Sequence, residues 1–231
     1  MERNLLIAIA LFSVAAAANA DTFALIPSRA AQDPTDIIDW TQLGPDPTQL
    51  TTPQLVSSFN GNLAQIGNVN GSDFLRVDEG ASWPGDFDFG ESLLWTGNLN
   101  FATGGLGPLI IVLQNPVLSF GFGIQAEWPG AFTAKVEALD VNGSALFGAT
   151  FNGFSNNLEN GSAQFIGLAD TTGRNVSQIL ISTDSGASNP LFANDFAIND
   201  ISFTVPETGS IILLGGALLC MAGAFRRKVR N

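Results

Sequence analysis

The sequence predicts an all-β protein, an antiparallel β-sandwich or jelly roll, and three observations support that prediction. Short apolar runs recur along the middle of the chain, separated by Gly, Asn, Asp and Pro, which favour turns. Several of these runs alternate apolar with small or polar residues at a period of two. No stretch of the middle region has a sustained 3.6-residue apolar period with helix caps. Many short antiparallel strands with Gly-rich turns are typical of two sheets packed face to face.

The clearest strand signals lie between residues 109 and 151. Residues 109–113 form a continuous apolar run that predicts a central buried strand, closed by Asn115-Pro116. Asn142-Gly143 predicts a hairpin with a type I′ turn, because both central positions of that turn need a positive φ. Residues 131–140 alternate, and the apolar face of this strand carries Phe132, Ala134, Val136 and Ala138.

The remaining chain divides into a lead-in and a domain. Residues 21–60 are a Pro-rich lead-in, in which residues 36–40 predict a short strand that carries Trp40 into the core. Residues 61–204 are expected to form the sandwich itself. Near its end the apolar face changes across Asn199-Asp200, which predicts a β-bulge there. Other strands are expected at residues 74–77, 92–95, 117–125, 145–151, 164–168, 176–182 and 196–203.

Two terminal segments flank this domain and predict export. Residues 1–20 have a basic start, an apolar centre and a small-x-small end, which are the features of a helical secretory signal peptide. Residues 205–231 contain an apolar run at 211–225, followed by the basic residues Arg226, Arg227 and Lys228, which predict a membrane helix with its end in the cytoplasm. Fifteen helical residues span roughly 22 Å, against about 30 Å of hydrocarbon, so the span is marginal.

The tail Val205-Pro206-Glu207, its Gly-rich apolar run and its basic end together resemble the PEP-CTERM sorting signal of exosortase-processed bacterial proteins. The resemblance implies transient retention in the inner membrane, cleavage near Pro206-Glu207 by an exosortase-like protease, and transfer to the cell surface or release. Thr208 stands where that family usually has a second proline. The resulting V-P-E-T-G also resembles the L-P-x-T-G motif of sortase substrates, and an anchor that is never cut is a third interpretation.

The second half of the domain carries a further resemblance. Residues 165–168, 179–182 and 194–203, the last with the string F-A-I-N-D-I-S-F, resemble the closing strands of β-sandwich ectodomains in PEP-CTERM proteins. These domains are similar to galactose-binding-like jelly rolls. The resemblance implies a fold that binds carbohydrate in many proteins, although a fold alone does not determine a function.

Charge and composition exclude several classes of function. Between residues 21 and 204 there are 19 Asp or Glu and four Lys or Arg, a net charge of −15 that repels nucleic acid. The chain has no His, and its one Cys, Cys220, lies in the tail. A disulfide, a His- or Cys-based metal site and a His-dependent catalytic triad are therefore excluded. A hydrolase is disfavoured, because no nucleophile motif is present either, and we expect no enzymatic activity.

Two sets of residues are candidates for ligand binding. Asp86 and Asp88 lie two apart in W-P-G-D-F-D-F-G, hence on one face of an extended strand, where carboxylates could bind Ca²⁺; the other interpretation is a solvated strand face. Trp83 and Trp128 each begin a W-P-G turn and could stack on sugar rings, although core packing is the commoner role of Trp.

These observations predict an exported protein of the cell surface or extracellular matrix with a structural or adhesive role. The alternatives are a carbohydrate-binding module, supported by Ca²⁺ and directed at extracellular polysaccharide, and a sortase-anchored surface protein.

Overall fold

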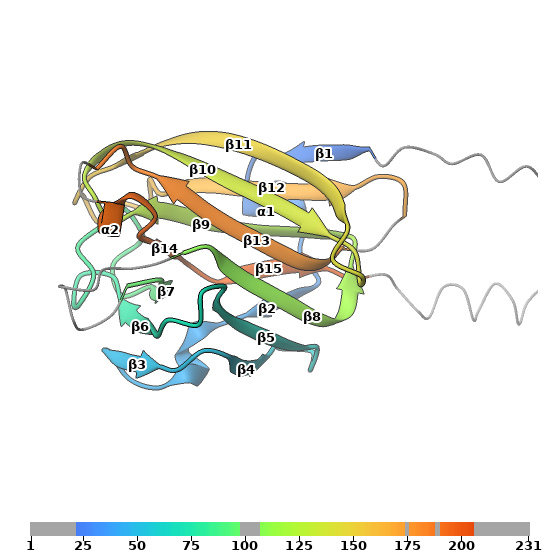
Figure 1. The fold of residues 1–231 in the computed structure, drawn as a ribbon, viewed down its shortest axis with the longest axis horizontal. Coiled ribbons are helices and arrows are strands. Elements are labelled where there is room, and N and C mark those ends of the chain that lie inside the picture. Colours follow the sequence, from blue (N-terminus) through green and yellow to red (C-terminus); the bar gives the residue numbers. More distant parts are fainter. Residues whose placement is uncertain (1–21, 98–106, 174–175, 188–189, 206–231) are drawn as a thin grey trace, which may run out of the picture.

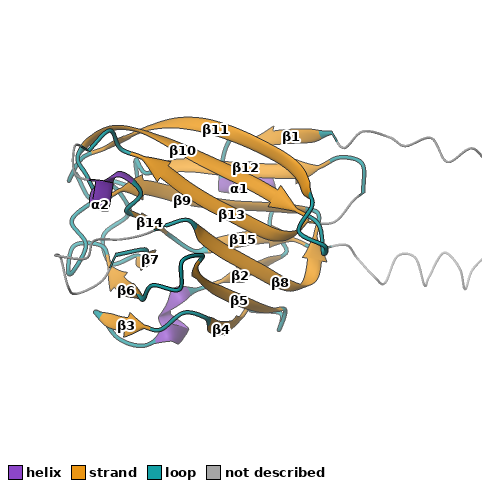
Figure 2. Cartoon of the chain, viewed as in Figure 1, coloured by secondary structure: helices purple, strands orange, loops and turns teal. Residues whose placement is uncertain are grey.

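A computed structural model describes residues 22–97, 107–173, 176–187 and 190–205 as two antiparallel β-sheets with three short helical segments. The sheets lie one over the other, as Figure 1 shows. Strands dominate the described part of the chain, as Figure 2 makes plain. The prediction of an all-β, two-sheet architecture is therefore confirmed.

The larger sheet has nine strands, and β9 is at its centre. The order along the sheet is β1-β12-β9-β14-β7-β6-β3, while β15 pairs with both β9 and β2. The strands of this sheet are β1 (Phe23–Ile26), β2 (Asp36–Ile38), β3 (Thr48–Leu50), β6 (Phe74–Asp78), β7 (Ser92–Trp95), β9 (Ser119–Ala126), β12 (Gln164–Asp170), β14 (Phe196–Ile198) and β15 (Ile201–Thr204).

The smaller sheet has six strands in the order β11-β10-β13-β8-β5-β4. The helical segments are short and lie in connections between strands. The strands are β4 (Gln54–Ser57), β5 (Leu63–Asn68), β8 (Leu109–Val117), β10 (Gly130–Leu139), β11 (Ala145–Ser155) and β13 (Val176–Asp184); the helical segments are α1 (Arg29–Gln32), the 3₁₀ helix η1 (Trp40–Leu43) and α2 (Pro190–Ala193).

The core lies between the sheets and follows the period of two that the sequence shows. On β10 the four predicted core residues are buried, while Lys135 on the opposite face is exposed. Every residue of β9 is buried, because α1 and neighbouring side chains cover its outer face. A second apolar cluster forms on the outer face of β6 and β7, beneath the loop of residues 79–91, and contains Leu75, Val77, Trp83, Phe87, Leu93, Trp95 and Ala197.

Two local predictions are confirmed. Trp40 is fully buried, and its Nε1–H donates to the Asn199 carbonyl at 2.9 Å. The bulge at Asn199-Asp200 is present: Ile198 pairs with Ile124 and Ser202 with Gly121, so four steps on one strand oppose three on the other. The extra residue lets both halves of this segment bury their apolar side chains.

Two other local predictions are wrong in detail. The hairpin between β10 and β11 forms, but its turn is not type I′, because only Gly143 has a positive φ there. The Asp140 carboxylate accepts the N–H groups of Asn142 and Ser144, each at 2.8 Å, and this favours a turn closed from Gly143 to Asp140. The strand from Leu109 continues through Asn115-Pro116 to Val117, because a break in its pairing with β13 leaves room for the proline.

The structure describes the lead-in but not the two terminal segments. Residues 22–60 supply β1, β2 and β3 to one sheet and β4 to the other, so they are woven into the same sandwich as the later strands. The predicted signal peptide at residues 1–20 and the predicted membrane helix lie outside the described residues. Within the described ranges, no helix is long and apolar enough to cross a membrane.

Candidate functional site

The two ends of the sandwich differ in what they present. The described chain enters β1 at Phe23, which pairs with Asp170, and leaves β15 at Thr204, which pairs with Ser119. Both points lie at one end of the nine-stranded sheet, because Asp170 and Ser119 close neighbouring strands there. At about 3.3 Å per residue, β9 carries the chain roughly 23 Å to the opposite end.

A pocket at that opposite end joins the two W-P-G turns. One turn follows β6 and contains Trp83, and the other follows β9 and contains Trp128. The sequence places these tryptophans 45 positions apart, and the fold brings both to one cavity of about 380 Å³. The residues that line it are Ser82, Trp83, Pro84, Trp95, Glu127, Trp128, Pro129 and Asn157.

The two tryptophans take different positions in this pocket. Trp83 is 3% exposed and meets Trp95 edge to face, with ring centroids 5.3 Å apart. Its buried Nε1–H has no hydrogen-bond partner among the residues that the structure describes. Trp128 is 47% exposed and stacks on Phe192 of α2, with centroids 5.9 Å apart. The pocket therefore has a buried aromatic wall, Trp83, and an exposed aromatic face, Trp128, which packs on Phe192.

One ionisable side chain lines the pocket. Glu127 is partly buried beside Trp128, and burial raises the pKa of its carboxyl group. Its backbone N–H donates to the Asp195 carbonyl at 2.9 Å, which holds the start of the turn. An aromatic platform beside a carboxylate suits a ligand with an apolar face and hydroxyl or amino donors.

The two predicted calcium ligands do not share a face. Asp86 is fully buried, and its carboxylate accepts the Asn156 N–H at 2.8 Å. Its own N–H donates to Gln125 Oε1 at 2.7 Å. Asp88 is exposed, and its backbone forms an isolated antiparallel β-bridge with Asn160. The backbone between the two aspartates bends instead of running straight, so the expectation of a common strand face is wrong.

The bend has a cause that the sequence did not reveal. The buried Glu79 carboxylate accepts the Gly85 N–H at 2.6 Å and the Phe87 N–H at 3.3 Å. Burial raises the pKa of Glu79, and these backbone hydrogen bonds oppose that rise. Nowhere in the described ranges do three or more His, Cys, Asp or Glu side chains gather as a metal site.

A polar cluster at the bulge was also missed by sequence reasoning. Asn199 Oδ1 accepts the Gly123 N–H at 2.6 Å, and Asn199 Nδ2 donates to Glu91 Oε1 at 2.8 Å. Arg29 Nη2 donates to the Asp200 carbonyl at 2.7 Å. Burial, together with the nearby charge of Asp39, raises the pKa of Asp200 to about 6, although Arg29 opposes the rise. The predicted bulge was the available signal for this cluster.

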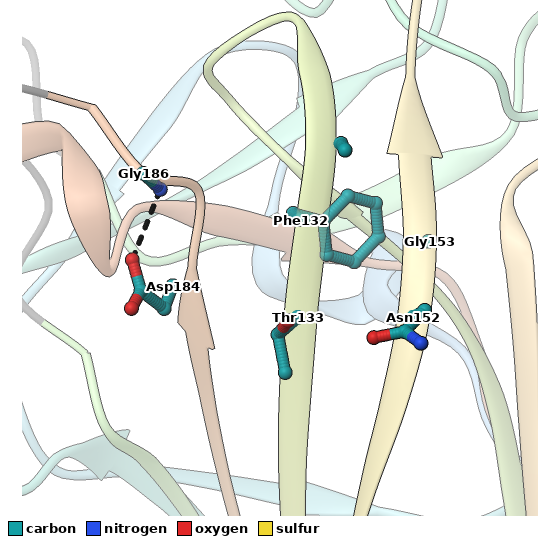
Figure 3. A pocket seen from close by; sticks show the side chains of 7 residues that line it. Phe132, Thr133, Asn152, Gly153, Asp184 and Gly186 are labelled. Atoms are coloured by element: carbon teal, nitrogen blue, oxygen red, sulfur yellow. Dashed lines mark hydrogen bonds between the residues drawn. The ribbon is translucent and has the colours of Figure 1, made fainter.

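Two further pockets lack the exposed tryptophan that the first pocket offers to a ligand. One, of about 350 Å³, includes Asp36, Asp39, Phe59 and Asp200 near the point where the chain leaves β15. The other, of about 330 Å³, is shown in Figure 3 between β10, β11 and β13. There Asp184 already accepts the Gly186 N–H at 2.9 Å, and Phe132 lies against Gly153, where a Cβ would come within 2.2 Å of the ring.

Of the predicted sorting residues, the structure describes only Val205. Val205 packs against the core, and its N–H donates to Thr35 Oγ1 at 3.0 Å. Pro206 and Glu207 lie outside the described residues, as do the basic residues Arg226, Arg227 and Lys228.

No family model matches the chain, and no curated protein matches it either. Among solved structures, a DUF4465 family protein from Bacteroides caccae is similar over 74% of this chain and all of its own, with 11% identity and a TM-score of 0.43. The enzymatically active domain of tailspike protein 4 from bacteriophage CBA120 is similar over 69% of this chain and 19% of its own, with 14% identity and a TM-score of 0.29.

Proposed function

We propose that this chain is an exported protein of the cell surface or extracellular matrix, sorted and cleaved by an exosortase-like protease, with a structural or adhesive role. The main support for this proposal is the position in the fold at which the sorting motif begins. Val205 follows β15 directly and still packs against the core. Cleavage near Pro206-Glu207 would remove the tail and leave every described strand in place. A motif at the end of the last strand suits the release of a folded domain.

Processing tests this proposal in the full-length chain. Replacing Pro206 and Glu207 by Ala should leave the intact protein in the membrane fraction, while wild-type secreted material should end near residues 205–208 by mass spectrometry. Thr208→Pro is the matched control, since it introduces the usual second proline and destroys the T-G pair of the sortase-like motif. Continued processing of that variant supports an exosortase. Recovery of Phe225 on the secreted form would contradict cleavage at this motif.

Carbohydrate binding is the second candidate function, because the fold brings both W-P-G turns to one pocket. Trp128 supplies the exposed face on which a sugar ring could stack, and Glu127 supplies an acceptor for its hydroxyl groups. The net charge of −15 on residues 21–204 disfavours polymers of acidic sugars. We therefore assign this pocket to neutral or amino-bearing polysaccharide. Ca²⁺ support of this binding stays a prediction.

A polysaccharide pull-down separates these assignments. The full-length protein should be retained by a neutral or amino-bearing polysaccharide and not by a polyuronate at the same ionic strength. Trp128→Ala should weaken retention by about tenfold or more, as expected for truncation of a central aromatic contact. Phe59→Ala is the control, since that ring is 92% exposed and lies in a different pocket. Equal retention of both variants would exclude this pocket.

A further inference from the structure

The edges of the two sheets are protected very unequally. The described edge strands β1, β2, β3 and β4 have four, three, three and four residues, and Pro47 and Pro53 flank β3 and β4. Short strands and nearby prolines are common ways to prevent pairing with another chain. The remaining edge strand, β11, has 11 residues and forms the border of the six-stranded sheet, as Figure 1 shows.

Beyond the register shift at its first residues, β11 lacks the features that usually block an edge. A-L-F-G-A-T-F-N-G-F-S has no charged residue and no proline. From Phe147 to Ser155 its register with β10 runs without a bulge. Among the described residues, β10 is the only strand that pairs with it. About 30 Å of strand therefore presents a row of outward backbone groups.

Electrostatics oppose the approach of a second copy less at this edge than at an acidic surface. Two molecules of net charge −15 repel over most of their surfaces. At β11 that repulsion is reduced, because the strand is uncharged and the neighbouring β10 carries the paired Lys135 and Glu137, 2.6 Å apart. A two-fold axis near Thr150 would place Gly148 opposite Asn152, and Ala149 opposite Phe151, of the second copy. In that register no two aromatic residues and no two charged residues lie opposite each other.

We propose that β11 pairs antiparallel with β11 of a second copy, with the two-fold axis near Thr150, to form a continuous twelve-stranded sheet. The backbone hydrogen bonds of the ladder would supply affinity, and the exposed Phe154 would add apolar contact at each end of the pair. This interface goes beyond the pocket and does not depend on it.

The pairing has a consequence for how the molecules are oriented. β11 begins at the end of the sandwich where the chain leaves β15. It runs toward the opposite end, which holds the pocket of Trp83 and Trp128, and there Ser155 Oγ donates to the Ala126 carbonyl at 2.8 Å. Antiparallel β11 strands therefore place the two points at which the chain leaves β15 at opposite ends of the pair. If the proposed membrane tail is retained, the pair links two facing surfaces and does not form within one membrane. This part rests on the membrane tail that the proposed function assigns to the protein before cleavage, whereas the pairing itself does not.

Sedimentation of the full-length protein in detergent tests the pairing. Wild type should show a concentration-dependent dimer, and Thr150→Lys should weaken it by about tenfold or more, because two lysines would lie opposite each other. Gln65→Lys is the matched control, since it adds the same charge at an exposed strand residue of the same sheet. A wild-type monomer at all concentrations, or equal dimerisation of both variants, would overturn the proposal.

A second variant covers the case in which Thr150→Lys fails to fold. Thr150→Cys with Cys220→Ser should form an intermolecular disulfide under mild oxidation, because directly opposed Cβ atoms in an antiparallel pair approach to about 4.5 Å, the upper end of the range that a disulfide spans. Gln65→Cys in the same background should not. Failure of Thr150→Cys to cross-link would overturn the register.

Vesicles carrying the full-length protein test the opposed tails separately. They should cluster with wild type and with Gln65→Lys, but not with Thr150→Lys. A dimer in detergent without clustering would overturn the opposed-tail orientation and leave the pairing intact. The processing experiment on Pro206 and Glu207 reports independently on the tail.

Discussion

The two W-P-G turns have the same three residues and opposite environments. The Trp83 turn is folded over β6 and β7 and is held by buried carboxylates, so its indole is 3% exposed. The Trp128 turn leaves the end of β9 and rests on α2, so its indole is 47% exposed. A tripeptide can therefore specify a turn while the surrounding strands decide whether its aromatic ring stabilises the fold or faces a ligand.

The largest expected difference between the turns is in stability. Trp83→Ala should lower the free energy of unfolding by about 3–5 kcal/mol, because it removes a large side chain from a packed cluster. Trp128→Ala should change it by about 0.5 kcal/mol or less, since half of that side chain is already in water. Urea unfolding followed by Trp fluorescence measures both. Similar losses for the two variants would contradict the assignment of separate roles.

Asp86 and Asp88, which follow the Trp83 turn, should also differ in how much they contribute to the free energy of unfolding. Asp86→Ala should destabilise the protein by about 1–3 kcal/mol, because it removes a fully buried carboxylate and leaves the partly buried Asn156 N–H without its acceptor. Asp88→Ala should be close to neutral, because Asp88 is exposed. Thermal melts of the two variants make the comparison. A larger loss for Asp88 would show that the exposed carboxylate has a role that its protein contacts do not explain.

The same pair tests the predicted Ca²⁺ site. If Ca²⁺ binds the native state, it should stabilise the protein by about 2.7 kcal/mol at one hundred times its dissociation constant, and this increment should vanish in Asp88→Asn. Thermal melts in EDTA, in Ca²⁺ and in NaCl of matched ionic strength separate binding from charge screening. No increment beyond NaCl would mean that the acidic surface serves solubility and binds no specific ion.

The smallest expected effect is a pH dependence at the second turn. Burial raises the pKa of Glu127 above its usual 4.5, so the folded state holds this proton more tightly than the unfolded state. Its contribution to stability is then present below pH 4.5 and is lost as the pH rises through the folded pKa. Glu127→Gln should remove this decline and leave the protein slightly more stable at neutral pH. If Glu127→Gln melts with the same pH profile as wild type, the carboxyl group is solvated in the folded state.

Much of the architecture follows from local pattern. The period of two on β10, the buried Trp40 and the bulge at Asn199-Asp200 were all predictable, because strand geometry sends alternate side chains to opposite faces. An extra residue between two apolar pairs can only be accommodated by a bulge if both pairs are to stay buried. These features depend on neighbours along the chain and on the existence of a core.

The sequence by itself determined the alternating faces of β10, the bulge at Asn199-Asp200, the lack of His and Cys between residues 21 and 204, and the strong negative charge of that region. Only the tertiary structure decided which indole is buried, why Asp86 and Asp88 separate, and how residues 22–60 join both sheets. It also brought Trp83 and Trp128 to one pocket and left β11 at an edge. The physical reason is range: periodicity reports on contacts between neighbours in the chain, whereas burial of a side chain depends on strands far away in sequence that cover it.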